Sequence, residues 1–212
     1  MSREMTHPRD ETLLDLAASQ LDRPHKLVLE AHLEQCAACR QRVGELAAPG
    51  GWWLEQMPSE APSPALWERL ERQVVAPVPA DSFAAGLPLP LCLRQELAGQ
   101  RKPRWWSILL NGGRVSVLLE DTVTKSLLCL GEMPGGRRFP RHEHLGFEQV
   151  TVLAGGYADE RGEFVAGDYQ SYEPGSVHGP DTLDGDPCWT LFRLDGKVQF
   201  AGWRGRLQRI FG

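Results

Sequence analysis

The sequence predicts an α+β protein of two domains: a small helical bundle stapled by zinc, followed by a β-barrel of the jelly-roll type. Apolar residues recur at helical spacing through roughly the first 50 residues. From Trp105 onward, short apolar stretches alternate with turn residues, as in a barrel. Each half also contains a cluster of metal-ligand residues. We predict a helical domain at 1–75, a linker at 76–90 and a barrel domain at 91–205.

The composition excludes several classes of protein. A net charge of −5 argues against direct binding to DNA as the main activity. The chain has no run of 18 or more apolar residues, so we expect no membrane span. The first residues lack the apolar core of a signal peptide, which predicts a cytoplasmic protein. An odd number of cysteines in that compartment indicates thiols or metal ligands; they are Cys36, Cys39, Cys92, Cys129 and Cys188.

Two helices are predicted before the first cysteine. Asp10 or Thr12 can begin the first helix, which should end near Leu21. Asp22 is a suitable N-cap for the second helix, and Pro24 suits its first turn. The apolar side of the second helix consists of Leu27, Val28, Ala31 and Leu33.

The second helix leads into an H-x3-C-x2-C pattern formed by His32, Cys36 and Cys39. An unbroken helix would place all three side chains on one face. A break near Gln35 would instead form a knuckle that opens a third helix over 40–47. Either geometry lets the three side chains converge, and imidazole with thiolates is typical of zinc sites.

A structural zinc site needs a fourth ligand, and the sequence offers two histidines. His7 precedes the first helix, and His25 lies at the start of the second helix. We prefer His7 because a ligand from a separate segment staples two elements together. The alternative to a zinc site is a buried thiol pair with a capping histidine.

A second break and a fourth helix follow. The stretch from Pro49 to Pro64 is rich in proline and glycine, which predicts an interruption. Ala65–Val75 then has the pattern of an amphipathic helix. Its apolar stripe either belongs to a domain core or binds a partner protein, and patterning does not separate the two. The stripe consists of Leu66, Trp67, Leu70 and Val74.

The barrel domain contains a second ligand cluster. His142 and His144 are two residues apart, so a strand would point both side chains to one face. Glu148 follows at an even spacing, and His178 must come from a second strand or its loop. Imidazole and carboxylate accept several divalent metals, including zinc, manganese, iron and nickel. The alternative is that these are ordinary surface or core polar residues.

Several strands and turns are predicted around this cluster. The stretch Leu127–Met133 is apolar at alternate and intervening positions, as in a strand buried on both faces. Trp189–Phe192 marks another strand. Gly155–Gly156 and Asp159–Gly162 are predicted as hairpin turns. A short basic helix is possible over Arg204–Phe211.

This half resembles the cupin family. The motif G-x5-H-x-H-x3-E-x6-G runs complete from Gly136 to Gly155. The second motif begins at Gly167 and has its histidine at His178, with two departures in detail. Pro174 directly precedes Gly175 instead of standing two residues before it, and Thr182 replaces the terminal asparagine of the motif. Neither departure affects a ligand. The resemblance implies a cupin β-barrel.

The N-terminal half resembles the zinc-binding anti-sigma domain, on the strength of His7, His32, Cys36 and Cys39. The order of the two domains resembles the ChrR family of anti-sigma factors. That resemblance implies that the first domain binds and inhibits an extracytoplasmic-function sigma factor. It also implies a role for the cupin in the response to singlet oxygen, through a small molecule or oxidant at its metal.

Two other functions compete with a regulator. The first is a metal-dependent cupin enzyme, such as a dioxygenase or isomerase, with an appended zinc module. The second is a small-molecule-binding cupin that reports to a partner. The ligand set leaves positions open on the metal, but no general base is evident beyond the ligands. A stand-alone enzyme has no need of the N-terminal zinc motif, which favours a regulator without turnover.

Overall fold

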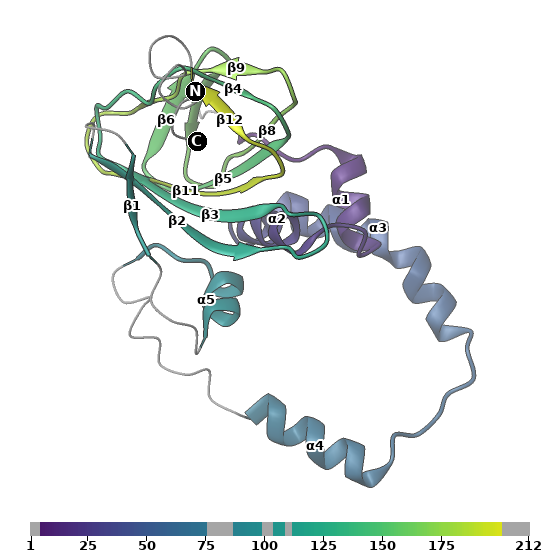
Figure 1. Cartoon of the computed structure of the whole chain (residues 1–212). Helices are drawn as coiled ribbons and strands as arrows, with labels where there is room; N and C mark the ends of the chain where they lie inside the picture. Colours follow the sequence, from purple (N-terminus) through teal and green to yellow (C-terminus); the bar gives the residue numbers. More distant parts are fainter. Residues whose placement is uncertain (1–4, 76–86, 99–103, 109–111, 201–212) are drawn as a thin grey trace.

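The computed structural model describes residues 5–75, 87–98, 104–108 and 112–200. Here 5–75 is called the N-terminal half and 104–200 the cupin half. The described residues form five helices and twelve strands (Figure 1). None of the helices in these ranges is both long and apolar enough to cross a membrane. Most of the predicted linker and all of the predicted helix over 204–211 lie outside the described residues.

The first two helices are α1 (Asp10–Ala17) and α2 (Arg23–Gln35). α1 ends before the predicted Leu21. The predicted start of α2 is confirmed, since the Asp22 carboxylate accepts a hydrogen bond from the His25 backbone N–H at 2.8 Å. α2 ends at Gln35, and Cys36 has extended φ and ψ values of −114° and 103°. The knuckle is therefore the geometry that forms.

The third helix, α3 (Ala37–Glu55), is longer than predicted. We expected it to stop at Ala47, and that prediction was wrong. Pro49 lies inside the helix. A proline lacks a backbone N–H and so removes one helical hydrogen bond, but this can kink a helix without ending it. The fourth helix, α4 (Pro64–Val75), forms where it was predicted.

The strands form one sheet of six strands and two sheets of three, all with antiparallel neighbours. The large sheet, in spatial order, contains β1 (Trp106–Ile108), β2 (Gly113–Glu120), β3 (Leu127–Met133), β11 (Cys188–Leu194), β5 (Glu148–Ala154) and β8 (Tyr169–Tyr172). One small sheet contains β10 (Asp181–Thr182), β6 (Gly156–Asp159) and β7 (Gly162–Val165). The other contains β12 (Val198–Phe200), β4 (His142–His144) and β9 (Val177–His178).

The predicted strands β3 and β11 are present, and Asp159–Gly162 is a hairpin turn in which β6 pairs with β7. The prediction of a hairpin at Gly155–Gly156 was wrong, because β5 and β6 lie in different sheets. Gly155 has a φ of 64°, and a side chain there would lie 2.4 Å from the Pro187 carbonyl oxygen. The glycine therefore allows the chain to change direction as it passes from one sheet to the other.

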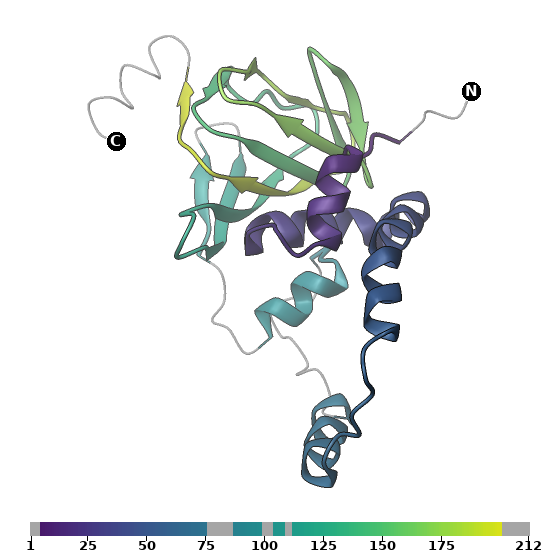
Figure 2. The ribbon, with the colours of Figure 1, turned by 90° about the vertical axis from the view of Figure 1, so that its right-hand side faces the viewer.

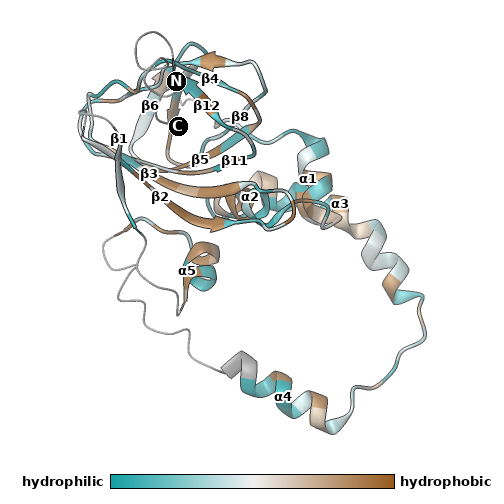
Figure 3. Cartoon of the chain, viewed as in Figure 1, coloured by the Kyte–Doolittle hydropathy of each residue, from teal (hydrophilic) through white to brown (hydrophobic). Residues whose placement is uncertain are grey.

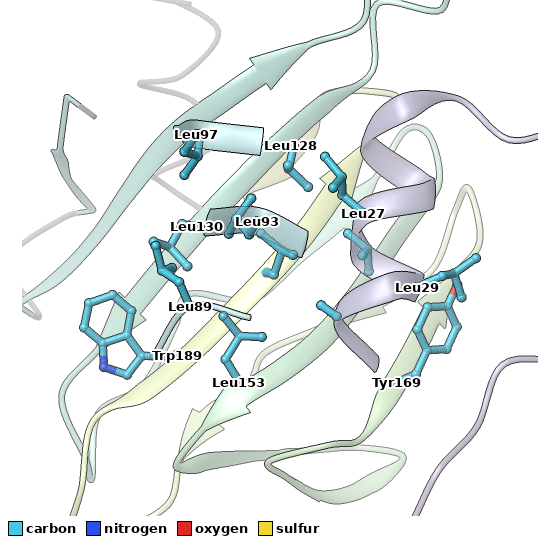
Figure 4. Close-up of a cluster of buried hydrophobic side chains, with 13 residues drawn as sticks. Leu27, Leu29, Leu89, Leu93, Leu97, Leu128, Leu130, Leu153, Tyr169 and Trp189 are labelled. Carbon is cyan, nitrogen blue, oxygen red and sulfur yellow. The ribbon is translucent and has the colours of Figure 1, made fainter. Parts of the chain in front are cut away.

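One hydrophobic core joins the N-terminal half to the large sheet. The apolar face of α2 and the short helix α5 (Leu91–Leu97) lie side by side on the same face of this sheet (Figures 1 and 4). Each fully buried leucine contributes about 1.5–3 kcal/mol of transfer free energy. Those labelled in Figure 4 are Leu27, Leu29, Leu89, Leu93, Leu97, Leu128, Leu130 and Leu153.

A buried ion pair crosses the same contact. Arg193 of β11 donates from Nε to Asp22 Oδ2 at 2.9 Å and from Nη2 at 2.5 Å. Its Nη1 donates to Gln149 at 2.9 Å. Burial alone would raise the pKa of Asp22, but the hydrogen bonds from Arg193 and from the His25 N–H outweigh it and lower the pKa. The N-cap of α2 is therefore fixed to the sheet by a charged group.

The helix α4 lies apart from the sheets in both views (Figures 1 and 2). The N-terminal half thus has two parts of different character. α2 is buried against the sheet, whereas the end of α3 and the whole of α4 extend away from it. A smaller apolar cluster surrounds the two cysteines and contains Met5, Leu13, Leu33, Val43 and Leu46.

Candidate metal centres

The predicted cupin ligands come from three short strands. His142 and His144 lie on β4, and His178 on β9 is the antiparallel partner of His142. Glu148 is the first residue of β5, after a break in the strand that carries the two histidines. The four ligand atoms all lie within 4.8 Å of one another, and all four residues are largely buried. The structure therefore gathers these four residues into one cluster.

Hydrogen bonds fix the proton positions of two of these histidines. His142 Nδ1 donates to the Pro140 carbonyl at 2.9 Å, and His178 Nδ1 donates to Asp159 Oδ2 at 3.0 Å. In a neutral imidazole the other nitrogen, Nε2, then holds a lone pair. The Nε2 atoms of His142 and His178 face each other at 3.1 Å. Two lone pairs at this distance repel unless a cation lies between them, so this cluster fits a metal ion.

The charge states of the cluster agree with a metal site. Burial, together with the neighbouring histidines, lowers the pKa of His142 to about 4 and that of His144 to about 3. Both imidazoles are therefore neutral, as a metal ligand must be. Burial, with a smaller effect of Asp159, raises the pKa of Glu148 to about 8. A bound cation would reverse that shift and ionise the carboxylate.

Two residues that support this cluster were missed from the sequence. Asp159 accepts hydrogen bonds from His178 and from the Tyr172 hydroxyl, the latter at 2.6 Å. The Tyr172 ring stacks on His144, with centroids 5.7 Å apart and an angle of 20° between planes. Asp159 was interpreted only as a turn residue, which it also is. No sequence signal separates these two roles.

A cavity of about 360 Å³ opens beside the cupin cluster. His142, Glu148 and His178 form part of its wall, and most of the remaining wall is apolar. This volume lies in the range of small-molecule sites. The apolar wall includes Val115, Val117, Leu127, Phe139, Val150, Phe192, Leu194, Val198 and Phe200, together with Cys129 and Cys188.

The N-terminal cluster gathers His7, His32, Cys36 and Cys39, again with ligand atoms within 4.8 Å of one another. His7 Nδ1 lies 3.5 Å from each of the two cysteine sulfurs. Cys36 is the N-cap of α3, and its sulfur accepts a hydrogen bond from the Cys39 N–H at 3.4 Å. Burial and the neighbouring Cys36 raise the pKa of Cys39 to about 12, which a bound cation would reverse.

His32 gives the clearest test of whether a metal fits this cluster. Its Nδ1 lies 2.7 Å from the Gly167 carbonyl, which can only accept, so Nδ1 carries the hydrogen. Its Nε2 is buried without a hydrogen-bond partner among the described residues. A buried nitrogen lone pair left without a partner is costly in free energy. A metal held by Nε2 would satisfy it, so the donor set fits zinc.

The alternative fourth ligand, His25, lies outside this cluster. Its Nε2 lies 3.3 Å from the Tyr169 hydroxyl instead. Burial, with Arg193 as the second cause, lowers the pKa of His25 to about 4. The structure therefore places His7 with the cysteines, and not His25.

The predicted partner stripe lies on α4. Trp67 and Leu70 are exposed to 54% and 41%, whereas Leu66 is half-buried. The side chain of Val74 is outside what the structure describes. The extension of α3, which the sequence analysis missed, adds more exposed large hydrophobic side chains close to this helix along the chain. They are Trp52, Trp53, Leu54 and Met57. Hydrophobic and hydrophilic segments alternate along α4 (Figure 3).

Comparison with known proteins places these features in context. Residues 94–198 match the family model of the ChrR cupin-like domain. The chain is 31% identical over 211 residues to the anti-sigma-E factor ChrR of Cereibacter sphaeroides, covering 97% of this chain and 96% of that protein. The crystal structure of Rhodobacter sphaeroides SigE in complex with the anti-sigma ChrR matches with a TM-score of 0.64 and 28% identity, covering 89% of this chain and 98% of the other.

The alignment with the anti-sigma-E factor ChrR covers 97% of this chain and so takes in both halves. The cupin cluster lies inside the matched cupin-like domain. The chain therefore belongs to the ChrR family of anti-sigma factors.

Proposed function

We propose that this protein is an anti-sigma factor that binds an extracytoplasmic-function sigma factor and keeps it from initiating transcription. The observation that supports this most strongly is the likeness, over 89% of the chain, to ChrR as it occurs in a complex with SigE. In this proposal residues 1–75 are the inhibitory domain, 76–90 are a linker and 91–205 are a cupin barrel.

The surface proposed to contact the sigma factor is the exposed part of α3 and α4. Trp52, Trp53, Trp67 and Leu70 are all exposed. Tryptophan is enriched among the residues that contribute most to protein–protein binding. An apolar centre of this kind also agrees with a large buried interface. The surface therefore offers anchors for a partner of the same class as SigE.

The two clusters are proposed to hold metals that serve different purposes. His7, His32, Cys36 and Cys39 would hold a zinc ion that staples α1, α2 and α3 into a bundle. His142, His144, Glu148 and His178 would hold a divalent metal with open positions. A structural zinc contributes folding free energy, whereas an open metal offers a place for a signal to bind.

The cavity suggests what reaches the cupin metal. Its wall is mostly apolar and includes His142, Glu148 and His178. A small molecule with an apolar body and an oxygen donor, or an oxidised product of such a molecule, would suit this space. We propose that such a signal, formed when cells meet singlet oxygen, weakens the hold on the sigma factor.

A second candidate function is favoured by the same cavity. Three histidines and a glutamate beside an apolar space could support a dioxygenase-like reaction. Assay of the metal-loaded chain for oxygen consumption with small apolar diketones and acids would test this. Turnover of any such compound would assign an enzymatic activity to the cupin half.

The regulatory proposal is tested by co-expressing the full chain with the sigma factor encoded nearest to it. We expect the two proteins to purify together and sigma-dependent reporter transcription to fall. Trp67→Ala should weaken the complex by about 2 kcal/mol if the helix is an anchor. Val123→Ala is a matched control, because Val123 is 88% exposed but lies on the β2–β3 turn. Failure of the wild-type chain to bind or silence any sigma factor would refute the proposal.

The signalling part needs a separate test. Glu148→Ala should give a protein that still inhibits but no longer releases on exposure of cells to singlet oxygen. The measurement is reporter transcription before and after exposure. Normal induction in this variant would rule out sensing at the cupin metal while leaving inhibition itself untouched.

A further inference from the structure

The N-terminal metal site is held from outside by the cupin half. Residues 167–169, at the start of β8, contact one ligand of that site, His32, and also Thr6, the residue before a second ligand. The Gly167 carbonyl accepts the Nδ1 hydrogen of His32 at 2.7 Å. The Tyr169 ring lies edge-on to His32, with centroids 6.0 Å apart. His32 is fully buried between the two halves as a result.

The segment that carries His7 is fixed by the same residues. The Asp168 carboxylate accepts from the Thr6 backbone N–H at 2.7 Å and from the Thr6 hydroxyl at 3.1 Å. The Thr6 carbonyl accepts from the Tyr169 N–H at 3.1 Å, and Gln170 donates to the Thr6 hydroxyl at 2.8 Å. His7 is the next residue and is itself exposed. Its position therefore depends on how Thr6 is held.

Close packing reinforces these hydrogen bonds. Gly167 has a φ of 96°, which favours glycine. A side chain at this position would also lie 2.7 Å from Met5 Cε. Asp168 is 1% exposed, and its second oxygen accepts from the Val165 N–H at 2.6 Å. Asp168 is thus hydrogen-bonded within the cupin half, and Gly167 packs closely against the N-terminal segment.

The two thiolate ligands are positioned differently. Cys36 and Cys39 lie at the junction of α2 and α3, where Cys36 caps the next helix. Their geometry comes from local structure in the N-terminal half. The two imidazoles come from separate segments. His32 is oriented by the Gly167 carbonyl. His7 follows Thr6, which is bound by Asp168.

We propose that the turn Gly167–Tyr169 is the outer shell of the N-terminal metal site and sets how firmly that site retains its metal. Partners that orient metal-bound histidines commonly change metal affinity by 10- to 100-fold when they are removed. Asp168 is a positioning residue, since it acts on His7 through Thr6. This inference rests on the proposed N-terminal metal site.

The test uses the full chain loaded with cobalt(II) in place of zinc. A thiolate-to-cobalt absorption band reports the N-terminal cluster alone, because the cupin cluster contains no cysteine. The rate at which this band disappears after addition of excess EDTA measures metal retention. Asp168→Ala should accelerate the loss by about 10-fold. Thr6→Val removes only the hydroxyl contacts and should accelerate it by a smaller factor.

Thr151→Val is the matched control. The Thr151 hydroxyl donates to the Val28 carbonyl of α2 at 2.8 Å, so it also joins the two halves, but it contacts no ligand of the site. It should leave the rate of metal loss at the wild-type value. An equal acceleration in Thr151→Val would show that general loosening of the contact is enough, and would overturn the proposal.

The other outcomes are also decisive. Metal loss at the wild-type rate in both Asp168→Ala and Thr6→Val would overturn the outer-shell role. If Asp168→Ala fails to fold, Thr6→Val decides, because it leaves the β7–β8 turn unchanged. Absence of the cobalt band in the wild-type chain would instead refute the N-terminal metal site itself, which keeps the two failures distinct.

Discussion

The two candidate metal centres are built in opposite ways. The cupin ligands lie on β4, β5 and β9, and the groups that orient His142 and His178 belong to the same half of the chain. The N-terminal ligands come from the segment before α1, from α2 and from the α2–α3 junction. The groups that hold His32 and the residue before His7 lie in the cupin half, whereas the cysteines are positioned by the α2–α3 junction itself. Strand register organises the first centre, whereas the second combines a local helix junction with a contact between the two halves.

The donor atoms differ as well. Two thiolates neutralise the charge of a zinc ion, which suits a closed structural site. Three neutral imidazoles and one carboxylate leave a divalent ion with a net positive charge, which suits an additional oxygen ligand. The strand β8 touches both centres, with Tyr169 beside His32 and Tyr172 beside His144. The two centres are therefore separate in chemistry but adjacent to one strand.

The largest expected effect is the loss of the N-terminal metal. The double variant Cys36→Ser/Cys39→Ser should lose this metal and unfold α1 and α3, because structural zinc contributes roughly 10 kcal/mol or more. Binding to the sigma factor should be lost with it. Metal analysis, circular dichroism and co-purification measure the three effects. A folded double variant that still binds its partner would contradict a structural role for this centre.

The next effect concerns the contact between the two halves, through the ion pair of Asp22 and Arg193. Asp22→Asn removes the carboxylate that binds Arg193 Nε and Nη2 and leaves Asp195, 3.1 Å from Nη1, as its charged partner. The variant should lower the free energy of unfolding by about 3 kcal/mol near neutral pH. The folded pKa of Asp22 lies below its usual value of 3.8. The stabilisation should therefore be complete above about pH 4 and decrease as the pH falls through the folded pKa.

The measurement is denaturant unfolding of wild type and variant at several pH values. The difference between the two proteins should shrink at acid pH. If the difference in free energy of unfolding stays constant with pH, the ion pair does not stabilise the contact between the halves. The apolar core would then account for that contact alone.

The sequence indicated which side chains gather in each cluster, partly because some of their spacing follows from local geometry. His142 and His144 alternate on a strand, and Cys36 and Cys39 lie one helical turn apart at a helix start. The Asp22 cap was predicted for the same reason, whereas the break near Gln35 was one of two geometries that the sequence left open. Each of these features depends on a few neighbouring residues.

The contact between the halves could not be read in the same way. The apolar side of α2 was visible in the sequence, but periodicity does not say what covers it. It faces the large sheet and α5 (Figure 4). Asp159 and Asp168 look like ordinary turn residues, although Asp159 accepts from His178 and Asp168 accepts from Thr6, the residue before His7. The helix through Pro49 was missed because proline was taken as a stop.

A smaller effect is expected from removing the cupin metal. His142→Ala/His178→Ala should lose about one equivalent of metal while the cobalt band of the N-terminal centre stays. The free energy of unfolding should fall by about 1–3 kcal/mol, because the apolar core of the large sheet does not include these residues. Unchanged metal content would show that these residues are not ligands, and loss of both metals would show that the centres are not independent.

The smallest expected effect tests the outer shell of the cupin centre. Asp159→Asn removes the charged acceptor of His178 Nδ1 and should weaken metal binding by roughly 10-fold, or about 1.4 kcal/mol. The N-terminal centre should be unaffected, since Asp159 accepts only from residues of the cupin half among the described residues.

Asp121→Asn is the control, because the Asp121 carboxylate accepts hydrogen bonds from the Val123 and Thr124 N–H groups of its own turn. Competition with a chelator of known affinity measures both variants. Equal affinities for the two variants would mean that strand register alone orients His178. A loss at the N-terminal centre would instead show that the cupin's outer shell reaches both metals.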